Sequence, residues 1–297
     1  MIRLVAIDLD GTLLSPDKTI SPANKQALLD AEAAGVNVVI CTGRPLSGVR
    51  PIFEEIGFKS NHSYSVINNG CTTVKSSDWS VISYDALSEE DLVYLDQLTQ
   101  EIHPQLSLFD LNRYIILNQE PSEIAKMDAA IVSAVPVPLG LEEVLEAQPI
   151  FQGMFIDQKE QIDVFQETYE EVLAQRFHTI RSQPILFEIL PKGVNKATGL
   201  KALAEYLGIP RQEVMAIGDE NNDIEMIEYA GLGVAMGNAP LLLKPWLMSL
   251  LLLTKKTVSP PLSSAMFYKH RTRKGKTNEI PNIIRTFFNL CQSQHSL

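Results

Sequence analysis

Three short apolar runs in this chain each end in polar residues. Residues 5–7 lead into Asp8, residues 37–41 lead into Thr42, and residues 213–217 lead into Gly218 and Asp219. An unbroken apolar run of this length is typical of a strand that is buried on both faces of a parallel sheet. The pattern therefore predicts a parallel sheet whose strands end in functional residues, at the edge where open α/β sheets bind ligands.

Helical patterns lie between these predicted strands. Ser21 followed by Pro22 is typical of a helix start, and Gly35 is typical of the end of that helix. A second helix is predicted to begin at Lys196, with apolar residues at helical spacing and a stop at Gly208. Strand, helix and strand in succession form a βαβ unit, so the predicted fold class is α/β with a Rossmann-like parallel-sheet core.

The long segment in the middle of the chain carries no catalytic motif of its own. Strands are predicted over residues 106–117 and 149–157, and helices are predicted from Ser88 onward and over residues 122–133 and 158–176. We interpret residues 84–187 as an inserted α/β domain. The core domain then comprises residues 1–83 and 188–240.

Asp8 and Asp10 are the most specific chemical signal in the sequence. At the two-residue period of a strand they point the same way. Carboxylates that follow a buried strand require a compensating charge, for which a metal cation is the obvious candidate. The alternative is a polar turn, in which aspartate is a common residue.

Ordinary structural roles could also explain the presence of Lys196, Asp219 and Asp223. A lysine in a first helical turn opposes the helix dipole, but a single lysine is more often exposed to solvent. Asp219 and Asp223 lie at a turn that enters a helix, where capping alone favours acidic residues. All of these positions converge on one predicted sheet edge, and this convergence favours a common site.

The chain contains four motifs, which are in order Asp8-Leu9-Asp10-Gly11-Thr12, Thr42-Gly43-Arg44, Lys196, and Gly218-Asp219 with Asn222-Asp223. Together they resemble the haloacid dehalogenase-like hydrolase superfamily, and more narrowly its Cof-type sugar-phosphatase subfamily. Segments 67–70 and 233–239 are also similar to that subfamily, and the resemblance is close through residue 240. It implies that the inserted domain is an α/β cap that closes over the active site and selects the substrate.

The resemblance implies catalytic roles for three residues. Asp8 would be the nucleophile that forms an aspartyl phosphate, and Asp10 would be the general acid and base. Lys196 would pair with both the phosphate and the nucleophile. The implied Mg²⁺ ligands are the carboxylates of Asp8 and Asp219 and the backbone carbonyl of Asp10.

The resemblance assigns further residues to phosphate binding and to support of the site. Asp223, with Asn222, would hold Lys196 and the water ligands of the metal in place. For Arg44 two interpretations stay open, phosphate binding and stacking on a neighbouring loop. The residues assigned to the phosphate are Thr42, Gly43, Arg44 and Asn222.

The implied function is a Mg²⁺-dependent phosphatase that acts on small phosphorylated metabolites such as sugar phosphates. One alternative is a phosphomutase or phosphonate-cleaving relative, although such relatives usually carry a helical cap between the first and second motifs. The other alternative is a binding or regulatory protein that keeps the fold but has weak catalytic activity. The sequence names neither the substrate nor the oligomeric state.

Composition agrees with an ordinary globular protein, because 45% of the 297 residues are hydrophobic and 21% are charged. Three cysteines without metal-type spacing, and no apolar signal segment before the first strand, lead us to expect a cytoplasmic protein. The five histidines form no triad or metal spacing. We expect neither nucleic acid nor a membrane as a partner.

Charge changes abruptly near residue 240. Residues 1–240 contain 16 Lys and Arg against 35 Asp and Glu, whereas residues 241–297 contain 9 basic residues and one acid, Glu279. The leucine run there is interrupted by Lys244 and Pro245 and is too short to span a membrane. Read one base earlier, codons 244–260 can encode a strand and the Glu-Asp-Gly-Val-Ala segment that the subfamily has there. We therefore predict that residues 241–297 are an atypical basic tail produced by a reading-frame shift.

Overall fold

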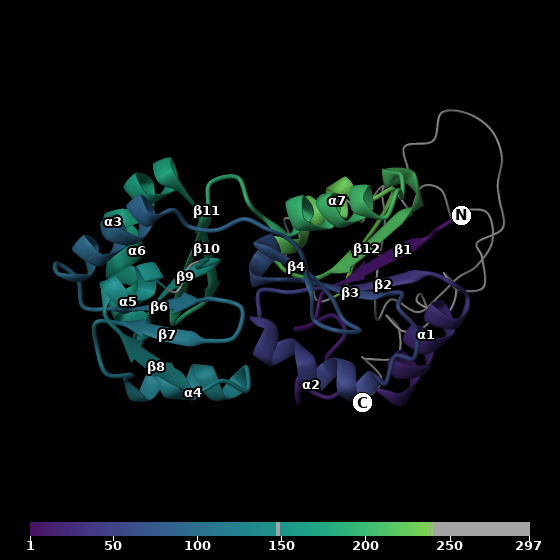
Figure 1. Cartoon of the computed structure of the whole chain (residues 1–297), viewed down its shortest axis with the longest axis horizontal. Helices are drawn as coiled ribbons and strands as arrows, with labels where there is room; N and C mark the ends of the chain where they lie inside the picture. Colours follow the sequence, from purple (N-terminus) through teal and green to yellow (C-terminus); the bar gives the residue numbers. More distant parts are fainter. Residues whose placement is uncertain (147–148, 238, 240–297) are drawn as a thin grey trace.

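The structure is a computed structural model that describes residues 1–146, 149–237 and 239. Figure 1 shows two lobes, each built around one β-sheet. The first sheet has seven strands and the second has six. The prediction about residues 241–297 lies outside the described residues.

The seven-stranded sheet has the order β13-β12-β1-β2-β3-β4-β5. Neighbouring strands from β13 to β3 are parallel, and β4 and β5 continue the sheet in antiparallel pairing. The three predicted strands are therefore adjacent, which confirms the predicted α/β core. The strands are β1 (Leu4–Ile7), β2 (Asn37–Cys41), β3 (Ser63–Ile67), β4 (Thr72–Lys75), β5 (Val81–Tyr84), β12 (Val214–Gly218) and β13 (Leu232–Ala235).

Both faces of this sheet are covered, which explains the unbroken apolar runs. Val5 packs in one cluster with Leu28, while its neighbour Leu4 packs in another cluster with Leu200. Figure 1 shows α1 and α2 on one side of the sheet and α7 on the other. The helices of this lobe are α1 (Pro22–Ala33), α2 (Leu46–Ile56), α7 (Lys196–Tyr206) and α8 (Ile224–Tyr229), with the 3₁₀ turns η1 (Asn68–Gly70), η2 (Arg211–Glu213) and η3 (Asn221–Asp223).

The predicted helix boundaries follow local capping. Ser21 Oγ accepts a hydrogen bond from the backbone N–H of Asn24 at 3.1 Å, at the start of α1. Helix α7 begins at Lys196, as predicted, with Asn195 as its N-cap. Gly208 follows that helix with φ +61°, in the left-handed region that glycine adopts without strain.

The six-stranded sheet has the order β10-β11-β9-β6-β7-β8. All neighbouring pairs are antiparallel except β7 and β8. The elements of this lobe are α3 (Glu89–Thr99), β6 (Gln105–Phe109), β7 (Tyr114–Leu117), α4 (Glu123–Ile131), β8 (Pro136–Leu139), α5 (Leu141–Glu146), β9 (Gln152–Ile156), α6 (Lys159–Arg176), β10 (Phe177–Gln183) and β11 (Leu186–Pro191).

The strand prediction over residues 106–117 is confirmed at both ends and wrong in the middle, because the structure has a hairpin of β6 and β7 there. Asp110 Oδ1 accepts hydrogen bonds from the backbone N–H groups of Asn112 at 2.8 Å and Arg113 at 2.6 Å. These two hydrogen bonds stabilise the turn in which the chain reverses direction between β6 and β7. Strands β8, β10 and β11 and helix α5 were not predicted from the sequence.

The two faces of the second sheet differ in character. Phe155 and Phe187 pack on one face in a cluster with residues of α3 and α6. Gln152, Met154 and Glu188 lie on the opposite face, since Glu188 pairs in register with Met154 and residues two apart share a face. This face lines a cavity between the two lobes.

Strand β11 bears on where the inserted domain ends. It belongs to the second sheet and continues to Pro191, beyond residue 187, whereas β5 belongs to the first sheet and ends at Tyr84. We therefore propose that the inserted domain comprises residues 85–191, the segment between the last strand of the first sheet and the end of β11.

The helices of the described residues include none with the length and hydrophobicity of a membrane span.

Candidate active site

A buried ion-pair network lies at the carboxyl ends of β1 and β12. Lys196 Nζ, from the first turn of α7, is 2.7 Å from Asp8 Oδ1 and 2.7 Å from Asp223 Oδ1. All three side chains are at most 6% exposed. The structure thus brings together two acids and a lysine that are far apart in the sequence, and Lys196 is buried rather than solvent-exposed.

Asp219 lies beside this network. Thr12 Oγ1 donates a hydrogen bond of 2.6 Å to Asp219 Oδ1. Gly11, with φ +88°, approaches so closely that a Cβ atom there would lie 2.3 Å from Asp219 Oδ2. The Asp-x-Asp-Gly-Thr motif therefore needs its glycine for both the backbone conformation and the space.

Asp223 organises the turn that follows β12. Its Oδ2 accepts hydrogen bonds from the backbone N–H groups of Asp219 at 2.9 Å and Glu220 at 3.0 Å. Both of its oxygens are thus engaged, one by Lys196 and one by the turn. This arrangement fits the supporting role that the resemblance implies for Asp223 better than direct metal binding.

The network holds more negative than positive charge. Asp8, Asp219 and Asp223 can each offer an oxygen within 4.8 Å of the others, and all three are buried. Three carboxylates and one ammonium leave an excess of two negative charges when all are ionised. Buried hard oxygens with this excess fit a divalent cation such as Mg²⁺.

The electrostatics of the network follow from burial. Burial raises the pKa of Asp8 well above its usual value, against the nearby ammonium of Lys196, and the charges of Asp223 and Asp219 raise it further. Burial alone would lower the pKa of Lys196, but the charges of Asp223 and Asp8 outweigh it and raise that pKa. The two carboxylates therefore favour the protonated, cationic form of Lys196.

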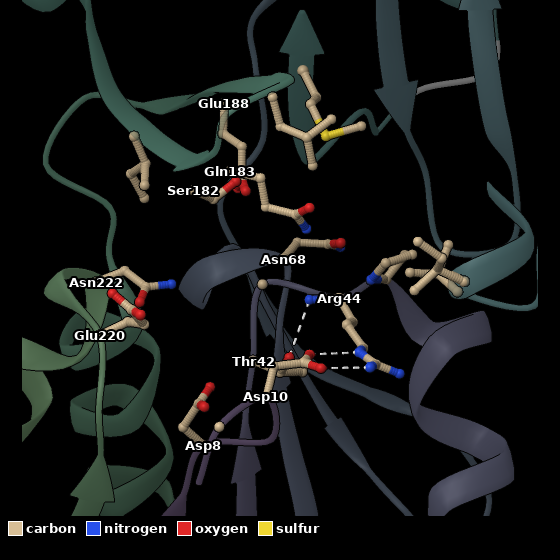
Figure 2. Close-up of a pocket in the computed structure, with 18 of the residues that line it drawn as sticks. Asp8, Asp10, Thr42, Arg44, Asn68, Ser182, Gln183, Glu188, Glu220 and Asn222 are labelled. Atoms are coloured by element: carbon tan, nitrogen blue, oxygen red, sulfur yellow. Dashed lines mark hydrogen bonds and ion pairs between the residues drawn. The ribbon is translucent and has the colours of Figure 1, made fainter. Parts of the chain in front are cut away.

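Asp10 has different partners from Asp8. Arg44 donates two hydrogen bonds to it, from Nε at 2.7 Å and from a terminal nitrogen at 2.6 Å (Figure 2). Lys18 Nζ lies 2.7 Å from Asp10 Oδ1. Burial would raise the pKa of Asp10, but the hydrogen bonds and charges of Arg44 and Lys18 outweigh it, so this pKa is lowered. Pairing with Asp10 is a role for Arg44 that sequence analysis did not consider.

The loop after β2 and the turn after β3 form the next part of the site. Thr42 Oγ1 accepts a hydrogen bond from the backbone N–H of Arg44 at 3.2 Å. Asn69 N–H donates to the Thr42 carbonyl at 3.0 Å, and Asn69 Oδ1 accepts from Asn222 Nδ2 at 2.9 Å. Asn222 therefore contacts Asn69, and in this structure Asp223 rather than Asn222 holds Lys196.

These residues surround a cavity of about 700 Å³ between the lobes. The second sheet forms its upper wall in Figure 2, with Glu188, Ser182 and Gln183 facing the residues of the first lobe. Asp223 is the one predicted site residue that is not on the cavity wall. The predicted residues on the wall are Asp8, Asp10, Thr42, Gly43, Arg44, Lys196, Asp219 and Asn222.

Glu188 is a site residue that sequence analysis missed. It is 6% exposed, accepts a hydrogen bond from Gln152 Nε2 at 2.7 Å, and also accepts one from Asn69 Nδ2 of the first lobe. Burial raises the pKa of Glu188 to about 7, although hydrogen bonding from Ser182 and Gln152 opposes the rise. A charged residue inside the apolar run 185–190 was the signal that could have revealed it.

Comparisons with known proteins identify the family of this chain. The sequence model of haloacid dehalogenase-like hydrolases matches residues 5–247. The Bacillus subtilis protein YxeH is 35% identical over 240 residues, which are 80% of this chain and 88% of YxeH. The 5-amino-6-(5-phospho-D-ribitylamino)uracil phosphatase YcsE of the same organism is 34% identical over 239 residues, 80% of this chain and 85% of YcsE.

A solved structure shows the same fold. The crystal structure of a haloacid dehalogenase-like hydrolase from Bacteroides thetaiotaomicron superposes with a TM-score of 0.73 at 26% identity, over 82% of this chain and 92% of that one. The parallel-sheet core with its inserted second lobe is the fold of that hydrolase. This chain belongs to the haloacid dehalogenase-like hydrolase family, within its phosphatase branch.

Proposed function

We propose that this protein is a Mg²⁺-dependent phosphatase that hydrolyses sugar phosphates or similar small phosphomonoesters through an aspartyl phosphate on Asp8. The observation that supports this most is the buried 2.7 Å contact between Asp8 Oδ1 and Lys196 Nζ on the cavity wall. Phosphoryl transfer depends on in-line positioning and on neutralising the charge of the phosphoryl oxygens. The positive charge of Lys196 lies beside Asp8 and favours the ionised, attacking form of its carboxyl group, against the effect of burial.

The proposed reaction has two steps. In the first, an Asp8 oxygen forms a bond to phosphorus while the bond to the leaving oxygen breaks, and Asp10 gives that oxygen its proton. In the second, water attacks the phosphorus, Asp10 takes a proton from the water, and the bond to Asp8 breaks to release phosphate. We propose that the Thr42 hydroxyl donates a hydrogen bond to the phosphate, which is supported by Arg44 N–H donating to Thr42 Oγ1, because that contact does not use the hydroxyl proton.

The pairing of Asp10 bears on these proton transfers. Arg44 and Lys18 hold Asp10 as a carboxylate, the form that accepts a proton in the second step. We propose that the phosphate dianion of the substrate competes with Asp10 for Arg44 and Lys18. Loss of these contacts would raise the pKa of Asp10, so that it can carry a proton in the first step.

The buried carboxylates provide the proposed metal site. Asp8 and Asp219 would hold Mg²⁺ together with the backbone carbonyl of Asp10, while Asp223 keeps the turn and Lys196 in place. When bound, the metal would neutralise charge on the phosphate oxygens.

The position of the insertion argues against a phosphomutase relative. The segment between the first and second motifs contains α1 and no further domain, and the second lobe follows the second motif. We propose that this lobe is the cap that selects the substrate. We also propose a cytoplasmic location, which is supported by the free, buried thiols of Cys41 and Cys71.

Phosphate release from para-nitrophenyl phosphate and from a panel of phosphorylated metabolites tests the function. We expect release with Mg²⁺, loss of release after chelation, and recovery when Mg²⁺ is restored. Brief incubation and acid quenching should trap one phosphoryl group on the peptide that contains Asp8, detected by mass spectrometry. No release from any ester, or a phosphoryl group on another residue, contradicts the proposal.

A further inference from the structure

Two neighbouring asparagines in the turn after β3 differ in how their side chains are used. Asn69 accepts a hydrogen bond from Asn222 and donates one to Glu188. Asn68 is 1% exposed, yet among the described residues neither its Oδ1 nor its Nδ2 has a hydrogen-bond partner. Buried amides are normally paired, because an unpaired one has lost its hydrogen bonds to water, so Asn68 requires an explanation.

The backbone fixes where Asn68 lies. Its N–H donates to the Arg44 carbonyl at 3.1 Å, and its own carbonyl accepts from Cys71 N–H at 3.1 Å. The side chain lines the cavity, and Figure 2 shows it between Thr42 of the first lobe and Gln183 of the second. An alcohol that leaves from a phosphate bound near Thr42 would extend into this space.

A second unpaired amide atom reaches the cavity from the second sheet. Gln152 is 3% exposed, and its Nε2 donates to Glu188 Oε2 at 2.7 Å. Glu188 Oε2 accepts from Gln152 Nε2 and also from Asn69 Nδ2, so the NH₂ end of the Gln152 amide is the end that faces Glu188. Its Oε1 has no partner within the described part of the chain. The cavity wall therefore offers one buried donor, Asn68 Nδ2, and two buried acceptors, Asn68 Oδ1 and Gln152 Oε1.

The chemistry of these three atoms indicates the group that they bind. They are neutral, whereas the positive charges of the cavity lining belong to Lys18, Arg44, Arg181 and Lys196. A hydroxyl group both donates and accepts, so it can pair with an amide N–H and with an amide oxygen. Alkyl and aryl groups without hydroxyls would leave all three atoms unpaired.

We propose that Asn68 is a specificity-determining residue whose amide, with Gln152 Oε1, binds hydroxyl groups of the leaving alcohol. The enzyme then prefers phosphate esters of polyhydroxylated alcohols to those of simple alkyl or aryl alcohols. This inference rests on the proposed phosphatase function and assigns it a selecting residue.

Asn68→Gly is the informative variant. Asn68 has φ +50°, in the left-handed region, so glycine removes the amide without straining the backbone. Asn118→Gly is the matched control, because Asn118 has φ +56° but is exposed and lies outside the cavity wall. Thermal unfolding of both variants establishes that each is folded.

The first measurement compares kcat/KM for ribose 5-phosphate, erythritol 4-phosphate, methyl phosphate and para-nitrophenyl phosphate. We expect the wild type to favour the hydroxylated esters. In Asn68→Gly the ratio of kcat/KM between a hydroxylated ester and methyl phosphate should fall about tenfold or more, and in Asn118→Gly it should stay unchanged. A wild type without this preference, or an equal loss for every ester in Asn68→Gly, overturns the proposal.

A binding measurement separates this inference from the proposed function. Calorimetry with the Asp8→Asn variant, with and without Asn68→Gly, measures the affinity for ribose 5-phosphate and for methyl phosphate in the absence of turnover. We expect Asn68→Gly to weaken the binding of ribose 5-phosphate more than that of methyl phosphate. If the wild type hydrolyses no ester, the phosphatase proposal fails, and this binding difference still decides the role of Asn68.

Discussion

Two parts of the cavity differ in how completely their polar atoms are paired. In the first lobe, Asp8, Lys196 and Asp219 on the cavity wall, with Asp223 next to them, contact one another or the adjacent turn at 2.6–3.0 Å. On the opposite wall, and in the first-lobe turn that faces it, buried amide atoms of Gln152 and of Asn68 have no partner among the described residues. We infer that the groups that act on every substrate are held by protein contacts before the substrate binds. The amides that recognise a particular substrate gain their hydrogen-bond partners only when it binds.

The largest expected effect concerns Asp8, the proposed nucleophile, on the first-lobe wall, which we call the paired wall because its charged side chains contact one another. Asp8→Asn keeps the shape of the side chain but removes its nucleophilic and metal-binding charge, so kcat should fall by about 10³-fold or more. The matched control is Asp30→Asn, at an exposed position of α1, which should keep wild-type kcat. Steady-state release of phosphate measures both variants, and wild-type activity in Asp8→Asn would refute the mechanism.

Removing the cation of the same wall should affect stability as well as catalysis. Lys196→Met leaves Asp8 and Asp223 buried without their ammonium partner, at a cost of about 3–5 kcal/mol in the free energy of unfolding. Lys201→Met, at an exposed position of the same helix, should cost less than about 1 kcal/mol. Urea unfolding measures both.

Magnesium provides an internal check on that result. Because Lys196→Met increases the excess of negative charge, Mg²⁺ should raise its unfolding midpoint more than that of the wild type. Equal stability losses in the Lys196 and Lys201 variants would contradict the view that this wall is an integrated charge network.

The pH dependence of the free energy of unfolding tests the role of Glu188 on the opposite wall. Burial raises its pKa from 4.5 to about 7 in the folded state, so the folded state binds the proton more tightly than the unfolded state. Its contribution to stability is therefore full below pH 4.5 and is lost as pH rises through 7. Glu188→Gln removes this loss and should gain about 2–3 kcal/mol relative to the wild type between pH 5 and pH 8.

Unfolding measured at pH 5 and at pH 8 gives the effect of Glu188→Gln on the free energy of unfolding. Glu90→Gln, at an exposed position of α3, is the control and should show no such gain. A constant difference between Glu188→Gln and the wild type across this range would show that Glu188 does not titrate with a raised pKa.

The smallest expected effect comes from a change that leaves both walls intact. Restoring the alternative reading frame after codon 240 should stabilise the chain by about 1 kcal/mol or more, because β13 is an edge strand of the described first sheet and the restored segment predicts a further strand. Thermal unfolding and solubility of the two chains provide the measurement. Sequencing of the gene decides the premise, which fails if the frame is intact and related chains carry the same basic tail.

The paired wall was largely predictable from the sequence. An apolar run that ends in Asp8, a lysine that opens a helix, and Asp219 after a third run are local patterns, and parallel pairing of β1, β2 and β12 brings their ends together. The opposite wall was not predictable in the same way. Strands β10 and β11 were missed, and Glu188 was hidden inside an apolar run.

The sequence by itself determined the fold class, the catalytic motifs and the resemblance to one family, because strand periodicity, helix capping and motif spacing are local properties. Only the tertiary structure determined which side chains contact one another. It paired Arg44 with Asp10, linked Asn69 to Glu188 across 119 positions of sequence, and left Asn68 without a partner in the part of the chain that the structure describes. The physical reason is that burial and hydrogen bonding depend on which distant elements pack together, and no local pattern encodes that contact.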